Sequence, residues 1–273
     1  MSIRDLAVAY DGGAAADAAL AYAAAIAEPR GAFVTGLIAQ STFEAYAFES
    51  RYIPKEAQDI IERHNAQRLT DIVARFETRA ATLYPGERMA HQELTGKVDR
   101  TLIRCARSHD ILVMGNEPDA GTDFHFLANP DIIVLKSGRP VVVVPSGHEP
   151  KAAHSHAVVA WDGKRAAARA LADALDLLEA DGHVTLLMIG EDELPRPVEE
   201  VVRHLNRHGV EATPVRRPAS GDVAEAILAF AAQTDPCVLV MGAFEHSKFS
   251  VDLFGGKTRR VIANATTPVM ISY

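Results

Sequence analysis

The chain contains an internal repeat, and this repeat constrains its fold more than any other sequence feature. A short apolar strand that ends at an aromatic residue and an aspartate occurs twice, as DLAVAYDGG near the start and HAVVAWDGK near the middle. Each copy later has a second apolar strand, at 111–115 and 238–242, and closes on a Pro-led strand, at 140–144 and 268–271. The shared order of these landmarks predicts two like-folded halves rather than one large domain.

A short polar, turn-rich segment at 146–150 separates the two copies. Such segments are typical of linkers between domains. We therefore expect one domain at residues 1–147 and a second at residues 152–273.

Within each half, apolar strands alternate with helical segments. In the second half we expect strands at 157–161, 183–189, 211–216, 238–241 and 268–272, and helices at 166–179, 195–208, 222–234 and 258–264. Asp222 and Glu225 have the spacing of a capping box. Continuous apolar strands separated by helices predict an α/β fold with a parallel sheet that helices cover on both faces. Ligands of such sheets bind beyond the carboxyl ends of the strands, where the strand order reverses. This rule favours Asp162-Gly163 and the chain from Gly242 onward.

The first half is longer than the second. From Asp11 to Gly115 there are 104 residues, against 80 from Asp162 to Gly242, so the first half has about 24 extra residues, which we place around 40–65. The aromatic stretch there leads into a predicted long helix at 56–83. We favour packing on its own domain over a cover for a pocket or a dimer contact.

The segment after Gly242 has the residues of a phosphate-binding loop. Gly242 leaves a strand, and Gly-Gly-Lys-Thr at 255–258 opens a helix. Glycines let backbone N–H groups approach a ligand, and a helix start offers unpaired N–H groups and partial positive charge. Lys257 adds a charge, and the Thr258 hydroxyl can bind a phosphate oxygen or a Mg²⁺-bound water. The segment is not a Walker A loop, because Val251 replaces its first glycine. The alternative is a glycine turn in which Thr258 only caps the helix.

Together, the strand-Asp start, the LVMG strands, the spaced glycines and the Pro-led last strands resemble the universal stress protein family in its tandem form. The nucleotide motif of that family is G-x2-G-x9-G-[ST]. Gly242 and Gly255 match its first and third glycines, and Gly256 takes the Ser/Thr position, as in a G-G-x-T variant in which Thr258 supplies the hydroxyl. Glu245 replaces the second glycine, and a carboxylate repels phosphates unless Mg²⁺ intervenes.

The resemblance implies an ATP-binding stress-response or regulatory protein that uses its second half, with Mg²⁺ as the accompanying ion. It places the adenine and ribose near Asp162 and the end of the strand at 183–189, and the triphosphate along the later glycines. The binding residues that it implies are Asp162, Gly163, Ile189, Met241, Gly242, Gly255, Gly256, Lys257 and Thr258. Asp162 has an alternative role, since an aspartate after a strand often caps the next helix.

The resemblance also implies how the halves meet. Each half becomes a flavodoxin- or Rossmann-like domain with a five-stranded parallel sheet, and the two pack as a pseudo-dimer. Their final strands, 141–144 and 269–271, are expected to pair, since apolar strand edges favour aggregation when left bare. A homodimer of whole chains is a further possibility.

The first half departs from the nucleotide motif. Asn-Pro-Asp at 129–131 replaces the Gly-Gly-Lys-Thr run, and Glu117, Asp119, Asp123 and Asp131 make the segment acidic. Because carboxylates oppose a polyphosphate, we expect this to be a lost nucleotide site that serves packing, an unidentified ligand or a partner.

Composition excludes several classes of function. The 273-residue chain is 48% hydrophobic, with a formal charge of −8 and a pI near 5.8. We expect no binding to nucleic acid or to anionic membranes, which requires clustered Lys and Arg. No apolar run approaches the roughly 18–20 residues of a membrane span, and the start lacks a signal-type segment. Cys105 and Cys237 form no CxxC pair, so we interpret them as buried small hydrophobes in a reducing, cytoplasmic protein.

Catalytic motifs are not evident. His204 and His208 are four residues apart, a spacing that metal ligands can use, but a solvated helix face is the favoured interpretation. No base stands beside the phosphate loop, so we expect a weak ATPase at most. Two other classes stay open: a nucleotide-independent interaction protein in which both sites have decayed, and a slow adenine-nucleotide hydrolase.

Overall fold

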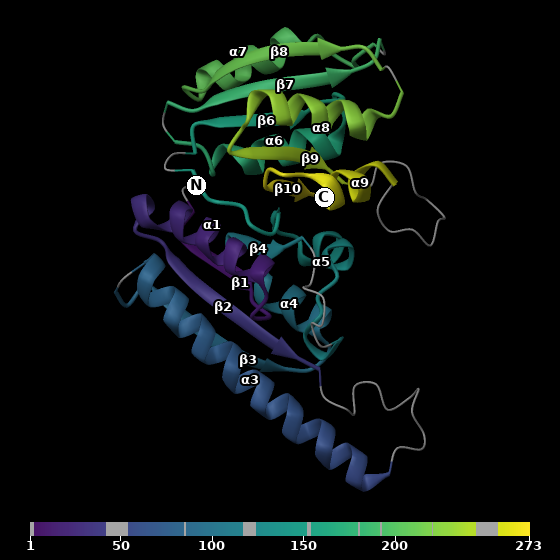
Figure 1. The fold of residues 1–273 in the computed structure, drawn as a ribbon. Helices are drawn as coiled ribbons and strands as arrows, with labels where there is room; N and C mark the ends of the chain where they lie inside the picture. Colours follow the sequence, from purple (N-terminus) through teal and green to yellow (C-terminus); the bar gives the residue numbers. More distant parts are fainter. Residues whose placement is uncertain are drawn as a thin grey trace.

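The computed structural model describes residues 3–41, 54–84, 86–116, 124–151, 154–179, 181–191, 193–219, 221–243 and 256–273. These residues form one ten-stranded sheet with helices on both faces (Figure 1). The strands are β1 (Asp5–Ala9), β2 (Phe33–Gln40), β3 (Met89–Thr95), β4 (Ile111–Gly115), β5 (Val141–Val144), β6 (His156–Ala160), β7 (His183–Ile189), β8 (Glu211–Arg217), β9 (Val238–Gly242) and β10 (Val269–Ser272). The helices are α1 (Ala14–Arg30), α3 (Lys55–Leu83), α4 (Val98–Ala106), α5 (Pro130–Ser137), α6 (Arg165–Leu175), α7 (Val198–Arg207), α8 (Val223–Thr234), α9 (Gly256–Asn264) and a short 3₁₀ helix, Phe124–Phe126.

The strand order confirms two repeated five-stranded halves. It runs β3-β2-β1-β4-β5-β10-β9-β6-β7-β8, so each half has the same internal arrangement. All neighbours pair in parallel except β5 and β10, which are antiparallel, with Val142 opposite Met270. The predicted pairing of the two final strands is therefore confirmed, and it joins the halves into one continuous sheet.

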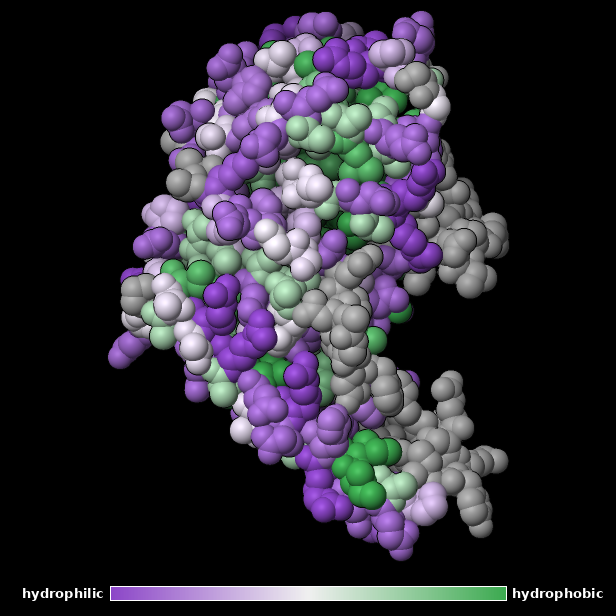
Figure 2. Space-filling view, viewed as in Figure 1, coloured by the Kyte–Doolittle hydropathy of each residue, from purple (hydrophilic) through white to green (hydrophobic). Residues whose placement is uncertain are grey.

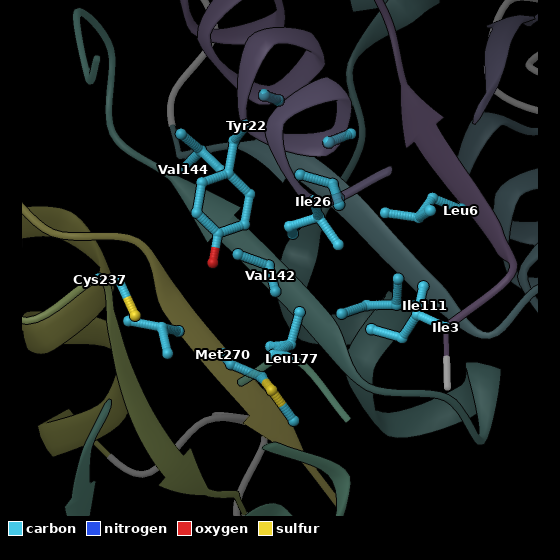
Figure 3. Close-up of a cluster of buried hydrophobic side chains, with 14 of the residues drawn as sticks. Ile3, Leu6, Tyr22, Ile26, Ile111, Val142, Val144, Leu177, Cys237 and Met270 are labelled. Atoms are coloured by element: carbon cyan, nitrogen blue, oxygen red, sulfur yellow. The ribbon is translucent and has the colours of Figure 1, made fainter. Parts of the chain in front are cut away.

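Two apolar layers hold this sheet. One lies under α1, α3, α6 and α7, and the other under α4, α5, α8 and α9. Figure 3 shows part of the first layer, where Tyr22, Ile26 and Val142 of the first half lie near Leu177 and Met270 of the second. The two halves therefore share an apolar core as well as a strand pairing. Separating them would expose this apolar surface to water, which is unfavourable.

Local sequence signals account for most element boundaries, with a few differences. Helix α9 begins at Gly256 rather than at the expected 258, so Gly256 and Lys257 belong to its first turn. Helix α7 begins at Val198 because Pro197 is its N-cap residue. The capping-box prediction is half right. Asp222 accepts a hydrogen bond from the Ala224 N–H at 2.8 Å, whereas Glu225 accepts one from Arg260 instead of the helix start.

The predicted long helix of the first half is present as α3, which extends past the edge of its sheet (Figure 1). Its buried face packs through Ile72 and Phe76, and the Phe76 ring occupies the space that Gly36 on β2 leaves open. Figure 2 shows hydrophobic side chains at the free end of α3, where Ile60 is 59% exposed. The aromatic stretch before it lies outside the described residues. No helix within the described part of the chain is long and apolar enough to cross a membrane.

Candidate functional site

The candidate site lies where the strand order of the second half reverses. Strands β6 and β9 are neighbours there, with Val159 opposite Val240. Asp162 and Gly163 follow β6, and Gly242 ends β9, so the structure brings these predicted residues to the same carboxyl edge of the sheet. In such sheets this crevice is the usual ligand position.

Asp162 closes the turn that opens α6. Its Oδ1 accepts the Lys164 backbone N–H at 3.0 Å, and its Oδ2 lies 3.6 Å from Lys164 Nζ. The equivalent Asp11 of the first half accepts the Gly13 N–H at 2.9 Å in the same way. Both halves therefore use this aspartate to close the turn before the helix. The alternative role predicted for Asp162, capping of the helix, is wrong, because the N-cap residue of α6 is Lys164, whose side chain makes no capping hydrogen bond.

The glycines at this edge have packing reasons of their own. A Cβ on Gly242 would lie 2.4 Å from the Ala166 carbonyl carbon, and one on Gly115 would lie 2.6 Å from the Ala15 Cβ. Gly163 has φ +74°, and a Cβ there would lie 2.8 Å from Pro195 Cδ. Packing therefore requires these three glycines whether or not a ligand binds.

The two apolar residues predicted for the site have different positions. Met241 is buried in the core layer under α8 and α9, so it can offer a ligand only its backbone. Ile189 is half-buried at the end of β7, where the chain turns through Gly190. Arg216 Nη1 donates a hydrogen bond to the Gly190 carbonyl at 2.7 Å. The sequence did not predict Arg216 at this edge, because an arginine in an edge strand is usually a solvated side chain.

The first turn of α9 holds the remaining predicted residues. Gly256 begins the helix, and a Cβ there would meet nothing within 4 Å. Lys257 is exposed and Thr258 is buried. Gly255 and Glu245 lie outside the described residues. Because α9 connects the parallel strands β9 and β10, its start lies at the same carboxyl edge as Asp162.

Two arginines of α9 are held by carboxylates of other elements. Arg259 Nη2 lies 2.8 Å from Asp131 Oδ2 on α5 of the first half. Arg260 donates to Asp222, and also to Glu225 at 3.1 Å. Lys257 has no carboxylate partner among the described residues, so it is the cation of this turn best placed to meet an added anion.

The equivalent edge of the first half has different chemistry. A cavity of about 90 Å³ lies there, between the ends of β1 and β4 and the start of α5. Its lining is mainly apolar, from Leu37, Ala39, Val98, Leu102, Met114, Phe126, Leu127 and Ala128, with Asp11 and Asn116 among the polar residues. This volume is below the roughly 300 Å³ at which ligand pockets begin.

The start of α5 is capped from within the protein. Asn129 Oδ1 accepts the Asp131 N–H at 3.0 Å, and the Asn129 N–H donates to Asp99 Oδ1 at 2.7 Å. Of the four carboxylates predicted to make this segment acidic, Asp131 is paired with Arg259 and does not line the cavity. Glu117, Asp119 and Asp123 lie outside the described residues.

The other candidate residues are separate from this edge. His204 and His208 are both exposed on the outer side of α7. No group of three or more potential metal ligands exists among the described residues. Cys237 is buried as expected, whereas Cys105 on α4 is only half-buried.

Comparison with known proteins agrees with this architecture. Residues 154–272 match the universal stress protein family. A universal stress protein from Archaeoglobus fulgidus DSM 4304 is 14% identical, with a TM-score of 0.69 over 98% of this chain and 96% of that one. A functionally unknown protein from Pseudomonas aeruginosa PAO1 is 14% identical, with a TM-score of 0.55 over 99% and 92%. No curated protein matches the chain significantly. The carboxy-terminal half of this chain therefore matches the universal stress protein family, and the amino-terminal half repeats the same strand order.

Proposed function

We propose that this chain is a regulatory stress-response protein whose carboxy-terminal half binds ATP. The observation that carries the proposal is the start of α9, where Gly256, Lys257 and Thr258 form a cationic first turn at the carboxyl edge of the sheet. Unpaired N–H groups and a partial positive charge make such a turn favourable for phosphate.

Each candidate residue has a definite task in this proposal. The N–H groups of the first turn and the Lys257 ammonium bind phosphate oxygens, and the Thr258 hydroxyl binds a phosphate oxygen or a Mg²⁺-bound water. The adenine and ribose lie between the turn at Asp162-Gly163 and Ile189. Mg²⁺ offsets the nearby carboxylates, because its charge screens them from the phosphates.

The first half does not take part in nucleotide binding in this proposal. The N-terminus of α5, which corresponds to that of α9, is already capped by Asn129. Its neighbouring cavity of about 90 Å³ is mainly apolar and too small for a nucleotide. One nucleotide per chain is therefore the expected stoichiometry.

A nucleotide-independent interaction protein is the second candidate. It is favoured by the observation that Gly163 and Gly242 are required for packing and that Asp162 already bonds within its own turn. These residues would persist in a half that had lost its ligand. A slow adenine-nucleotide hydrolase is the third class, and turnover distinguishes it from the other two.

Tryptophan fluorescence provides the test. Trp161, the single tryptophan, immediately precedes Asp162 and is largely buried. We expect MgATP to change its emission, and Lys257→Gln to weaken the affinity at least about tenfold, because a hydrogen bond to a charged group contributes about 1.5–3 kcal/mol. Lys136→Gln, which makes the same charge change on α5, serves as the matched control.

Each alternative outcome has a clear meaning. No response at millimolar ATP, with calorimetry also showing no heat of binding, would support the interaction protein. Binding that Gly255→Asp leaves intact would place the nucleotide elsewhere. Multiple turnovers of ATP would favour the hydrolase.

A further inference from the structure

Five polar side chains, two of them buried and three half-buried, gather where the two halves meet. Tyr22 and Arg30 come from α1 of the first half, His148 from the linker, and His154 and Glu179 from the second half. His154 is 2% exposed, and its ring meets the Tyr22 ring edge-to-face with centroids 5.1 Å apart. The His148 ring lies 6.0 Å from the same tyrosine. We call these five residues the junction cluster.

Two atoms of the junction cluster are buried without a hydrogen-bond partner in the described structure, His154 Nε2 and the Tyr22 hydroxyl oxygen. A neutral imidazole tolerates this position at modest cost. A protonated imidazole carries an N–H donor on both ring nitrogens together with a full charge. Because Nε2 has no acceptor here, protonation would bury an unsatisfied charged donor.

The charges around His154 oppose protonation. Arg30 Nη2 donates to the Leu177 carbonyl at 2.7 Å, which fixes a guanidinium beside the cluster. Glu179 Oε1 accepts the backbone N–H of His154 at 3.3 Å and so is engaged away from the ring. Burial first, then the Arg30 and His148 charges, lower the pKa of His154 to about 4.

Asp176, like Glu179, acts on Arg30, and neither carboxylate is among the charges that shift the pKa of His154. Burial first, and then the charge of Lys151, lower the pKa of His148, and Lys151 itself pairs with Asp235 at 2.8 Å. Burial raises the pKa values of the Tyr22 phenol and the Cys237 thiol, so both stay neutral. Acidification therefore adds positive charge to a junction that already holds Arg30.

We propose that the junction cluster is an acid-sensitive joint, in which protonation of His154 loosens α1 and the linker from the carboxy-terminal half. This opening is independent of nucleotide binding, and protonation alone triggers it. Since the unfolded or opened chain takes up this proton near pH 6.5 and the closed junction only near pH 4, opening is favoured on the order of 100-fold more at the lower pH.

Cys237 provides a local reporter of this opening. It is 3% exposed, and its thiol donates to the His156 carbonyl at 2.7 Å. Figure 3 shows it in the second half on the side that faces Tyr22. In a Cys105→Ser chain it is the only thiol, so its reaction rate with dithiodipyridine, divided by the rate of the urea-unfolded chain at the same pH, measures protection.

We expect protection at pH 4.5 to be at least tenfold lower than at pH 7 in the chain that retains His154. His154→Gln, which cannot be protonated, should keep its protection within twofold across this range. His204→Gln, on the exposed face of α7, should behave like the parent chain. Arg30→Gln should move the midpoint of the labelling transition to higher pH, because a positive neighbour of His154 is removed.

The proposal is overturned if protection of the parent chain does not change with pH, or if His154→Gln shows the parental fall. A purely structural role would weaken protection in Arg30→Gln equally at every pH and leave the midpoint unchanged. If His154→Gln does not fold, His154→Phe retains an aromatic edge against Tyr22 and takes its place in the same comparison.

Discussion

Arg259 Nη2 lies 2.8 Å from Asp131 Oδ2, and this ion pair joins the first turns of α9 and α5 across the two halves. The Arg259 side chain is 58% exposed, whereas that of Asp131 is 12% exposed. The carboxylate is therefore mostly withdrawn from water and depends on its partner. In the proposed function, the helix that binds phosphate is thus tied to the equivalent helix of the half that has lost its site.

Arg259→Gln should lower the free energy of unfolding by about 1–2 kcal/mol, because it leaves a nearly buried carboxylate without its counter-charge. In a double-mutant cycle with Asp131→Asn, urea unfolding should give a coupling energy of about 1 kcal/mol. Arg196→Gln breaks a more exposed pair with Glu200 and should cost less than about 0.5 kcal/mol. A coupling energy near zero would show that the ion pair contributes nothing to the junction.

Gly242→Ala should lower the free energy of unfolding by about 1–3 kcal/mol, since the new Cβ would lie 2.4 Å from the Ala166 carbonyl carbon. Gly115→Ala should have a similar effect through Ala15. Gly256→Ala is the matched control, because nothing lies within 4 Å of its Cβ position and alanine favours a helix. Thermal unfolding of the three variants is the measurement. Equal stability of Gly242→Ala and the parent chain would contradict the packing explanation.

The stability of the chain should depend on His154 between about pH 6.5 and pH 4. The folded pKa of His154 is lowered to about 4, so the unfolded chain binds more protons than the folded chain throughout this window. The free energy of unfolding therefore falls as the pH falls. Urea titrations at several pH values should show a steeper fall in the parent chain than in His154→Gln. Parallel curves would mean that other groups cause the acid sensitivity.

Phe76→Ala should lower the free energy of unfolding by about 3–5 kcal/mol, because Phe76 is almost fully buried between α3 and β2. Its ring also meets Tyr10 edge-to-face at 5.2 Å, so the loss includes an aromatic pair. In the Phe76→Ala variant, amide hydrogen exchange should become faster in α3 than in α6 or α8. Ile60→Ala on the exposed part of α3 should change stability by less than about 0.5 kcal/mol. A small effect of Phe76→Ala would show that α3 docks by other contacts.

The repeat and its strands could be predicted because their signals are local. Runs such as VLVMG and PVVVV are buried on both faces, and such strands need no partner information to be recognised. Pairing of β5 with β10 came from the family resemblance, and the structure confirms it. The ends of α6 and α7 differed from expectation by a few residues, where turns and Pro197 decide the boundary.

The site was harder to predict because packing requires several of the same glycines that are typical of a binding loop. The glycine pattern predicted that Gly242 lies at the carboxyl edge of the sheet, but not that Ala166 packs against it. The acidity of the first half was judged along the chain, whereas Asp131 finds Arg259 more than a hundred residues away. Such contacts depend on how the halves meet, which local patterns do not encode. The assignment of Lys257 and Thr258 to a nucleotide remains a prediction.

The antiparallel contact between β5 and β10 joins two halves of one chain, and two separate identical subunits could in principle form the same contact. Two identical free-standing subunits joined at that contact would carry two identical crevices and could not specialise separately. A fused chain always supplies one copy of each version, in a one-to-one ratio that expression level cannot disturb. Permanent fusion therefore permits an unequal pair, because one half can change its chemistry without changing the other.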